Sequence, residues 1–180
     1  MYRIVENFIE KNHMIQPGDT VLAGVSGGGD SMTMLDILRR FREKKDFTLQ
    51  AVHIHHQIRE GEADRDCVFV EEMCRKWGIP CRIYTYPVPA LAKKWKVGLE
   101  EAGRMVRQDA FSQEKKRLGL SEGNMKIALA HNKNDLAETM LHNLARGTGI
   151  RGLSAMSPKD GQIIRPVLCM EKKESVHYLK

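Results

Sequence analysis

A glycine-rich segment near the N-terminus lies between an apolar run and a helical pattern: Ser26-Gly27-Gly28-Gly29-Asp30-Ser31. The apolar run at residues 21–25 predicts a buried strand, and the apolar spacing after the segment predicts a helix. Glycines let backbone N–H groups approach an anion closely, and the start of a helix adds a favourable dipole. The sequence therefore predicts a strand, a tight turn and a helix that cradle a phosphate group, although a turn with Asp30 or Ser31 as a simple helix cap has the same pattern.

Strands and helices alternate along the rest of the chain. The patterns predict strands at residues 21–25, 49–54, 81–86 and 127–130, with a short edge strand at 163–164. They predict helices at residues 2–14, 31–44, 62–77, 99–118 and 134–144, and from 172 onward. This alternation indicates an α/β fold of the Rossmann-like type, a mostly parallel sheet of about five strands with helices on both faces. Polar segments that follow the strands should then meet around one cleft.

Length and composition narrow the class of protein. A chain of 180 residues with 42% hydrophobic content suits one domain with its own core, so we expect residues 1–180 to form a single domain. The net charge of +6 favours a polyanionic partner, and charge for solubility alone explains it equally well. No apolar run is long enough for a membrane span, and acidic residues come too early for a signal peptide, so we expect a cytoplasmic protein without a membrane partner.

Four cysteines occur without a C-x-x-C motif: Cys67, Cys74, Cys81 and Cys169. The spacing signals neither a zinc knuckle nor a redox pair, and we expect reduced, mostly buried thiols.

Two acidic residues are candidates for holding a divalent cation beside bound phosphates. Asp30 lies in the glycine-rich segment, and Asp135 follows the strand predicted at 127–130. Carboxylate oxygens are the ligands that Mg²⁺ prefers. Asp135 also suits the first turn of a helix, where an acidic side chain is stabilising whatever the function.

Histidines and arginines supply the other candidates. No cysteine or acidic residue at a suitable spacing joins His53, His55 and His56, so phosphate contacts, base contacts or structural hydrogen bonds are expected there rather than zinc. His131 lies at a strand end, where a general acid, a general base or a phosphate donor belongs, and a loop hydrogen bond is the alternative. Arg104 and Arg107 are one helical turn apart and could hold a phosphate together or form a solvated face.

The glycine-rich segment lacks the Lys-Ser/Thr pair of the P-loop and the spacing of a dinucleotide fingerprint. The pattern Ser-Gly-Gly-x-Asp-Ser after a strand resembles instead the PP-loop family of ATP pyrophosphatases, which split ATP between its α and β phosphates. Five ordered segments resemble the catalytic domain of the tRNA(Ile)-lysidine synthetase family: residues 21–35, 51–59, 99–104, 129–141 and 146–153. The resemblance covers nearly the whole chain.

The resemblance implies a reaction and its partners. ATP adenylates the C2 oxygen of the wobble cytidine in the CAU anticodon of tRNA(Ile), and pyrophosphate leaves. The ε-amine of free L-lysine then attacks C2 and AMP leaves, which gives lysidine. ATP and Mg²⁺ are the implied cofactors, and the fold implied is the PP-loop type related to the adenine nucleotide alpha-hydrolases. The family's usual C-terminal tRNA-binding region is expected to be absent from residues 1–180, and a dimer is compatible with the sequence.

The resemblance also assigns roles to residues. The catalytic set is Asp30, His131, Asp135 and Arg104. The ATP-binding set is Ser26, Gly27, Gly28, Gly29, Asp30 and Ser31, with Asp30 and Asp135 as metal ligands. Glu138 is the candidate for the lysine ammonium, and the contacts with tRNA or phosphate are His56, Arg59, Arg107 and Arg146.

The chain departs from the family pattern at two strand ends. The family usually has Asp followed by His-Gly after the second strand, where this chain reads His55-His56-Gln57. It usually reads His-His-x-x-Asp-Asp-Gln after the fourth, where this chain reads His131-Asn132-Lys133-Asn134-Asp135-Leu136. One acid of the pair is thus an amide, which leaves less negative charge for a metal, and Asp135 is still expected to serve.

Two other functions are compatible with the glycine-rich segment. A PP-loop tRNA thiolase often carries paired cysteines, but the cysteines here fall on one predicted helix and strand and not in a loop beside the cleft. A non-catalytic ATP-binding module would not need both Asp30 and Asp135.

Overall fold

The computed structural model describes residues 1–58, 62–121, 123–147 and 156–178. Over these residues, six strands form one sheet in the order β3-β2-β1-β4-β6-β5. The strands are β1 (Thr20–Gly24), β2 (Thr48–His55), β3 (Cys81–Thr85), β4 (Met125–Ala128), β5 (Lys159–Asp160) and β6 (Ile163–Ile164). All neighbouring strands run parallel except β5, which is antiparallel to β6. The predicted mostly parallel α/β sheet is confirmed, with one strand more than the five expected.

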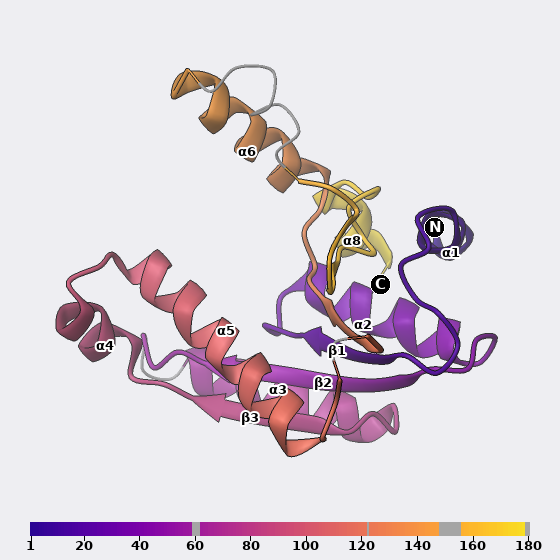
Figure 1. Cartoon of the computed structure of the whole chain (residues 1–180), viewed down its shortest axis with the longest axis horizontal. Coiled ribbons are helices and arrows are strands. Elements are labelled where there is room, and N and C mark those ends of the chain that lie inside the picture. The colour runs from indigo at the N-terminus through magenta and orange to yellow at the C-terminus, as the bar shows by residue number, and fades with distance from the viewer. Residues whose placement is uncertain (59–61, 122, 148–155, 179–180) are drawn as a thin grey trace.

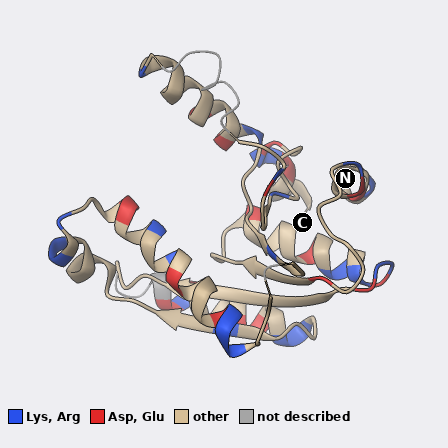
Figure 2. Ribbon diagram, in the orientation of Figure 1, with Lys and Arg blue, Asp and Glu red and all other residues tan. Residues whose placement is uncertain are grey.

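The described helices are α1 (Tyr2–Lys11), α2 (Gly29–Arg42), α3 (Glu62–Lys76), α4 (Val88–Trp95), α5 (Leu99–Arg117), α6 (Lys133–Ala145) and α8 (Lys172–Tyr178). None of them combines the length and the apolar character that a bilayer span needs. In Figure 2, acidic residues are interspersed with basic ones along α5.

Helices cover both faces of the sheet because the strand residues alternate between two cores (Figure 1). Val21 and Ala23 of β1 pack in a core with apolar residues of α1, α2 and α3. Leu22, between them, packs on the opposite face with Phe111 of α5. The strand that leads into the glycine-rich turn is therefore buried from both sides, which fixes the position of the turn.

Two sequence predictions about the strands need correction. The strand predicted at 127–130 is β4, which begins and ends two residues earlier, because Leu129 and Ala130 continue the apolar pattern beyond the strand and line a cavity. The short strand at 163–164 is not at an edge: it is β6, which lies between β4 and β5. The edge strand β5 is polar and only two residues long, so it left no hydrophobic pattern in the sequence.

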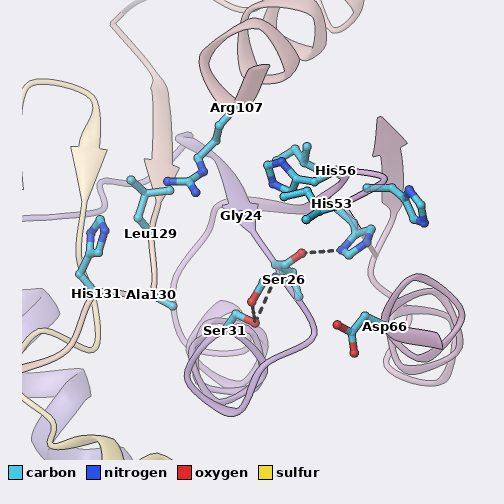
Figure 3. A pocket seen from close by; sticks show the side chains of 14 residues that line it. Gly24, Ser26, Ser31, His53, His56, Asp66, Arg107, Leu129, Ala130 and His131 are labelled. Carbon is cyan, nitrogen blue, oxygen red and sulfur yellow. Dashed lines mark hydrogen bonds between the residues drawn. The ribbon is translucent and has the colours of Figure 1, made fainter. Parts of the chain in front are cut away.

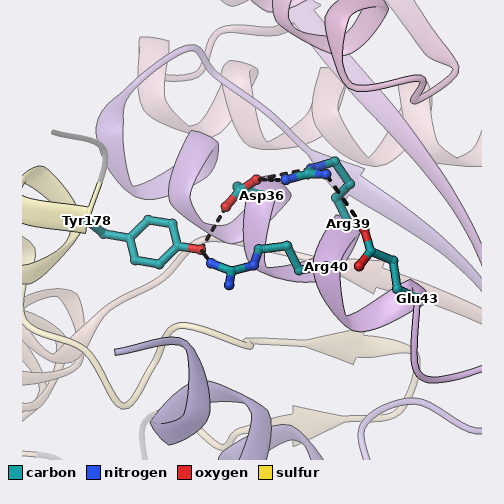
Figure 4. A network of polar contacts seen from close by, with 5 residues as sticks. All are labelled: Asp36, Arg39, Arg40, Glu43 and Tyr178. Atoms are coloured by element: carbon teal, nitrogen blue, oxygen red, sulfur yellow. Dashed lines mark hydrogen bonds and ion pairs between the residues drawn. The ribbon is translucent and has the colours of Figure 1, made fainter.

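The last described helix, α8, is fastened to α2 through polar contacts (Figure 4). The hydroxyl of Tyr178 donates to Oδ2 of Asp36 at 2.7 Å and accepts from Nη1 of Arg40 at 3.1 Å. Nearer the start of α2, the buried hydroxyl of Thr33 donates to the carbonyl oxygen of Ser175 at 3.1 Å. These contacts, with the apolar core, hold α2 along its length, and the N-terminus of α2 carries the glycine-rich turn.

Candidate functional site

A cavity of about 580 Å³ opens at the carboxyl ends of β1, β2 and β4 (Figure 3). Its lining includes residues 24–26, 53–56 and 129–131, so the segments predicted to follow three separate strands meet around one space. The sheet order reverses beside β1, and such a switch point is where ligands bind in open α/β sheets. The volume is in the range of ordinary small-ligand sites. We call this space the first cavity.

Hydrogen bonds of Ser26 and Ser31 fix the conformation of the glycine-rich turn. Ser31, 4% exposed, donates from its hydroxyl to the carbonyl oxygen of Gly28 at 2.9 Å and accepts from the N–H of Ser26 at 3.2 Å. Gly27 has φ +93°, a conformation that favours glycine, and a Cβ there would lie 3.2 Å from the Cβ of Asp66. Helix α2 begins at Gly29, and the N–H groups of a first helical turn have no partner within the helix. The turn therefore offers backbone donors and a helix dipole to an anion at the edge of the first cavity.

Asp30 and Asp135 are joined through a third residue, Asn132. Nδ2 of Asn132 donates to Oδ2 of Asp30 at 3.0 Å, and Oδ1 of Asp30 is buried without a hydrogen-bond partner in the described part of the chain. Oδ1 of Asn132 accepts from the N–H groups of Asn134 and Asp135, while Oδ2 of Asp135 accepts from the N–H of Asn132 at 2.9 Å. Asp135 is thus part of a capping box at the start of α6, the alternative role that its position predicted.

A divalent cation fits the donor set at this place. Oδ1 of Asp30 has no hydrogen-bond partner among the described residues, and a hard cation is a ligand that suits a carboxylate oxygen beside a phosphate site. Within the described ranges, no group of three or more His, Cys, Asp or Glu side chains is arranged to hold a metal by itself. Phosphate oxygens would therefore have to complete the coordination, as in sites where Mg²⁺ is bound together with a nucleotide.

Three histidines at the carboxyl end of β2 border the first cavity. Nδ1 of His53 donates to the carbonyl oxygen of Val25 at 2.8 Å, and burial lowers the pKa of His53. Burial, and then the charge of Arg107, lower the pKa of His56. His55 lies 2.9 Å from a carboxylate oxygen of Asp64 through Nε2. A structural hydrogen bond, one of the three roles predicted, thus holds His53, while Nδ1 of His56 is buried with no partner among the described residues.

The two arginines one turn apart on α5 have different surroundings. Arg104 is 62% exposed and forms a two-bond ion pair with Glu101, at 2.7 and 3.1 Å. Arg107 is half-buried, and burial lowers its pKa. Its guanidinium reaches toward Leu129 in Figure 3. The geometry places Arg107, rather than Arg104, at the wall of the first cavity.

A second cavity of about 1630 Å³ lies between α5, α6 and the β5–β6 hairpin. We call it the second cavity. Arg104 and Glu138 line it, as does Arg146, which follows α6. It is larger than a small-ligand site. The predicted contact Arg59 lies outside the described residues, as does the segment 148–155.

Sequence reasoning missed Asn132, which holds Asp30, and two residues that line the cavities. Asn132 has a recognisable signal, because Asn followed three residues later by an acid is a capping-box pattern. Arg165 directly follows β6, and a search of every strand end would have found it. Asp66 of α3 lines the first cavity opposite the glycine-rich turn, and nothing local in the sequence indicates that packing.

An open, mostly parallel sheet with a glycine-rich strand–turn–helix at its switch point defines the class of nucleotide-binding α/β domains. Within that class the chain belongs to the PP-loop family, because the PP-loop domain profile matches residues 1–180. The prediction of a PP-loop, ATP-binding domain is therefore confirmed.

Curated relatives are similar over nearly the whole chain. The tRNA(Ile)-lysidine synthase of Caldanaerobacter subterraneus subsp. tengcongensis is 46% identical over 172 residues, which cover 96% of this chain and 36% of the relative. The enzymes of the same name from Thermotoga maritima and Clostridium tetani are 45% and 41% identical and cover 93% and 99% of this chain. The chain spans somewhat over a third of the length of these relatives, with 39% and 38% of the latter two covered.

Solved structures share the fold. The U34-tRNA thiolase NcsA from Methanococcus maripaludis superposes with a TM-score of 0.77 at 20% identity, covering 98% of this chain and 60% of that one. The NH3-dependent NAD synthetase from Campylobacter jejuni has a TM-score of 0.62 at 17% identity, with coverage of 98% and 69%. At these identities the likeness supports the fold alone.

Proposed function

We propose that this chain carries out the ATP-dependent ligation of lysine to C2 of the wobble cytidine of a CAU-anticodon tRNA(Ile). In the first step the C2 oxygen of the cytosine attacks the α-phosphorus of ATP, and the α–β bond breaks with loss of pyrophosphate. In the second step the ε-amine of lysine attacks C2, the C2–O bond breaks, and AMP leaves with the oxygen. The relatives named for this reaction, similar over 93–99% of this chain, support the proposal.

The observation that carries the proposal is the meeting of two cavities at one wall. Arg107, Leu129 and His131 line both the first and the second cavity. The first has the glycine-rich turn at its edge and the size of a nucleotide site, and the second, at about 1630 Å³, is larger than a small-ligand site. A nucleotidyl transfer needs such an arrangement, because the acceptor oxygen must reach the α-phosphorus of ATP from the side opposite the leaving pyrophosphate.

Residues of the first cavity would hold the leaving group. The N–H groups at the start of α2 would bind the pyrophosphate, and the serine hydroxyls keep the turn in the shape that exposes them. Asp30, oriented by Asn132, and Asp135 would hold Mg²⁺, which when bound neutralises charge on the α–β bridge. Burial, and then the charge of Arg165, lower the pKa of His131, so at neutral pH this side chain is an uncharged hydrogen-bonding group able to accept a proton.

Residues of the second cavity would receive the amine. Glu138 is exposed, lies one turn after Asp135 on α6 and lines the second cavity, which suits a carboxylate that attracts an ammonium group. The amine must lose a proton before it attacks, and His131 at the shared wall or Glu138 would accept it. Exposed Arg104 and Arg146 would contact the RNA from the same cavity.

The cysteines argue against the rival function, a thiolase. In the described structure, none of the four lines either cavity. Cys67 and Cys74 lie on α3. Cys81 begins β3, so it lies at the amino end of that strand, whereas the first cavity opens at the carboxyl ends of the strands. Sulfur transfer requires thiols or a cluster beside the adenylated base, and no such group borders this site.

Pyrophosphate release from ATP tests the proposal. The chain is incubated with Mg²⁺, radiolabelled lysine and an unmodified tRNA(Ile) CAU transcript, and each component is omitted in turn. We expect release that requires the RNA, and lysine label that appears in it. A Glu138→Gln variant should raise the KM for lysine about tenfold, the size of a lost charged hydrogen bond, and leave the KM for ATP unchanged. RNA-dependent release that continues with sulfide in place of lysine would assign a thiolase, and ATP binding insensitive to loss of Asp30 and Asp135 would assign a non-catalytic module.

A further inference from the structure

Basic and hydrogen-bonding side chains gather at the wall that the two cavities share. Arg107 comes from α5, His131 follows β4 and Arg165 follows β6, so three elements distant in sequence converge there. Figure 3 shows Arg107 and His131 on either side of Leu129. The side chains of Arg107 and His131 line both spaces, and Arg165 lines the second.

Arg107 is a half-buried cation without a counter-ion among the described residues. Burial lowers its pKa, and no carboxylate in the described part of the chain offsets that effect. Other arginines of the same helix are paired, Arg104 with Glu101 and Arg117 with Glu114. Removing a guanidinium from water is costly unless a charged partner replaces the water, so an unpaired one at a cavity wall indicates a place for an anion.

Arg165 and His131 add unused donors to the same wall. Nε of Arg165 is buried and has no hydrogen-bond partner among the described residues, while its Nη1 is fixed by the carbonyl oxygen of Ser157 at 2.7 Å. Nδ1 of His131 is likewise buried without a partner in that part of the chain. Buried polar groups in native proteins are nearly always hydrogen-bonded, so two orphans at one wall call for a ligand or for ordered water.

The local charge favours a negative ligand. Arg165 and His131 line the same cavity, and after burial the charge of Arg165 is the next cause that lowers the pKa of His131. Two carboxylates act in the opposite direction: Asp135 on His131, and Asp160 on Arg165. Asp135 is already engaged in the cap of α6, and neither carboxylate contacts Arg107. The wall as a whole therefore retains an excess of positive charge.

We propose that Arg107 and Arg165, together with His131 at the same wall, form a seat for a nucleotide phosphate that is separate from the glycine-rich turn. The turn would take the pyrophosphate part of ATP, and the seat would take a single phosphate at the junction of the cavities. Two sources have this chemistry: the α-phosphate that remains on AMP, and a phosphodiester of the RNA strand. The RNA source rests on the proposed function, whereas the AMP source requires only ATP binding.

The test measures binding without catalysis. The Arg107→Gln and Arg165→Gln variants, with Arg75→Gln as a control, are titrated with AMP, with inorganic pyrophosphate and with a five-nucleotide single-stranded RNA centred on CAU. Arg75 is exposed near the end of α3 and lines neither cavity, so the control makes the same change of charge. Arg165→Lys keeps the positive charge and can keep a hydrogen bond to the carbonyl oxygen of Ser157. It therefore distinguishes loss of the phosphate seat from a disturbed backbone conformation at residues 157–165. Thermal unfolding of each variant confirms that it is folded.

Each outcome decides the proposal. We expect the two cavity variants to lose about tenfold in affinity for AMP or for the RNA, with pyrophosphate binding unchanged and Arg165→Lys less affected. A loss confined to AMP identifies the α-phosphate as the occupant. A loss confined to the RNA, with a shallower salt dependence, identifies a phosphodiester. Affinities for both probes equal to those of Arg75→Gln, or an equal loss for pyrophosphate, overturn the seat. Lysine incorporation is measured separately, so a failed ligation assay leaves this result standing.

Discussion

The side-chain amide of Asn132 donates a hydrogen bond of 3.0 Å from Nδ2 to Oδ2 of Asp30. The oxygen of the same amide caps α6, so one side chain that is 2% exposed joins the N-termini of α2 and α6. Asp30 is left with one hydrogen-bonded oxygen and one buried oxygen that has no partner in the part of the chain that the structure describes. The relationship makes Asn132 a positioning residue for the carboxylate beside the glycine-rich turn.

Replacing Asn132 should separate its two roles. Asn132→Ala removes the cap and the contact with Asp30, and we expect the free energy of unfolding to fall by about 1–2 kcal/mol. Asn132→Ser keeps a good capping residue but is too short to reach Asp30, so it should be more stable than the alanine variant while ATP binding in Mg²⁺ weakens as much. Urea unfolding and ATP titration across Mg²⁺ concentrations measure the two effects. Wild-type ATP affinity in Asn132→Ser would rule out the positioning role.

Gly27 should be required for nucleotide binding beyond its effect on stability. Gly27→Ala meets a left-handed φ of +93° and a contact with Asp66, so we expect a loss of about 1–2 kcal/mol in stability and a large loss of ATP affinity. Gly119 is the matched control, because its φ is +63° and a Cβ there has no neighbour within 4 Å. Gly119→Ala should lose similar stability, by urea titration, and keep its ATP affinity. Equal ATP affinity in the two variants would contradict the prediction.

The sequence predicted the features of this fold that depend on local pattern. The apolar run at residues 21–25 and the helical spacing after Ser31 predicted the strand, the turn and α2 to within two residues. The segments after β1, β2 and β4 were predicted to meet because parallel strands end at one edge of a sheet. These inferences need only the period of the apolar residues and a rule of topology.

The features that were missed depend on contacts between distant elements. Arg104 and Arg107 are alike in sequence, and only the packing of α5 buries Arg107 and leaves Arg104 exposed. The polar strand β5 exists because it pairs with β6, a contact that its own two residues do not signal. Asp66 reaches the turn only through the position of α3.

Stability should fall on mild acidification because several histidines are buried as neutral groups. Burial lowers the pKa of His53, of His56 and of His131 from the ordinary value of 6.5. The unfolded chain therefore binds these protons at a higher pH than the folded chain does. The free energy of unfolding should decrease as the pH falls below about 6.5, by at most about 1.4 kcal/mol per pH unit for each histidine, and level off below the folded-state values.

Urea unfolding between pH 7.5 and 5.5 measures this dependence. His53→Gln should reduce the slope, because it removes one of the groups that must take up a proton on unfolding. A stability that does not change over this range would contradict the assignment of neutral, buried histidines.

Two ion pairs on α5 with the same spacing should differ in their contribution to stability. Arg117 pairs with Glu114 at 2.6 Å and Arg104 pairs with Glu101 at 2.7 Å. Glu114 is fully buried and also accepts from the hydroxyl of Tyr84, whereas both members of the other pair are exposed. Burial would raise the pKa of Glu114, but hydrogen bonds from Arg117 and Tyr84 outweigh it and hold the pKa below its usual value.

Removing the arginine from each pair tests this difference. Arg117→Ala leaves a buried carboxylate without its cation, which is strongly destabilising, while loss of an exposed pair changes stability little. In urea titrations at pH 7, Arg117→Ala should therefore unfold at a clearly lower midpoint than Arg104→Ala, which should unfold close to the wild type. Lowering the pH toward the pKa of Glu114 should narrow the difference in urea midpoint between Arg117→Ala and the wild type. Protonation of Glu114 removes an uncompensated buried charge from the variant, and it removes a stabilising paired charge from the wild type. The side-chain amide of Gln50 also donates to Glu114. Equal midpoints at pH 7 would show that Tyr84 and Gln50 alone satisfy the buried carboxylate.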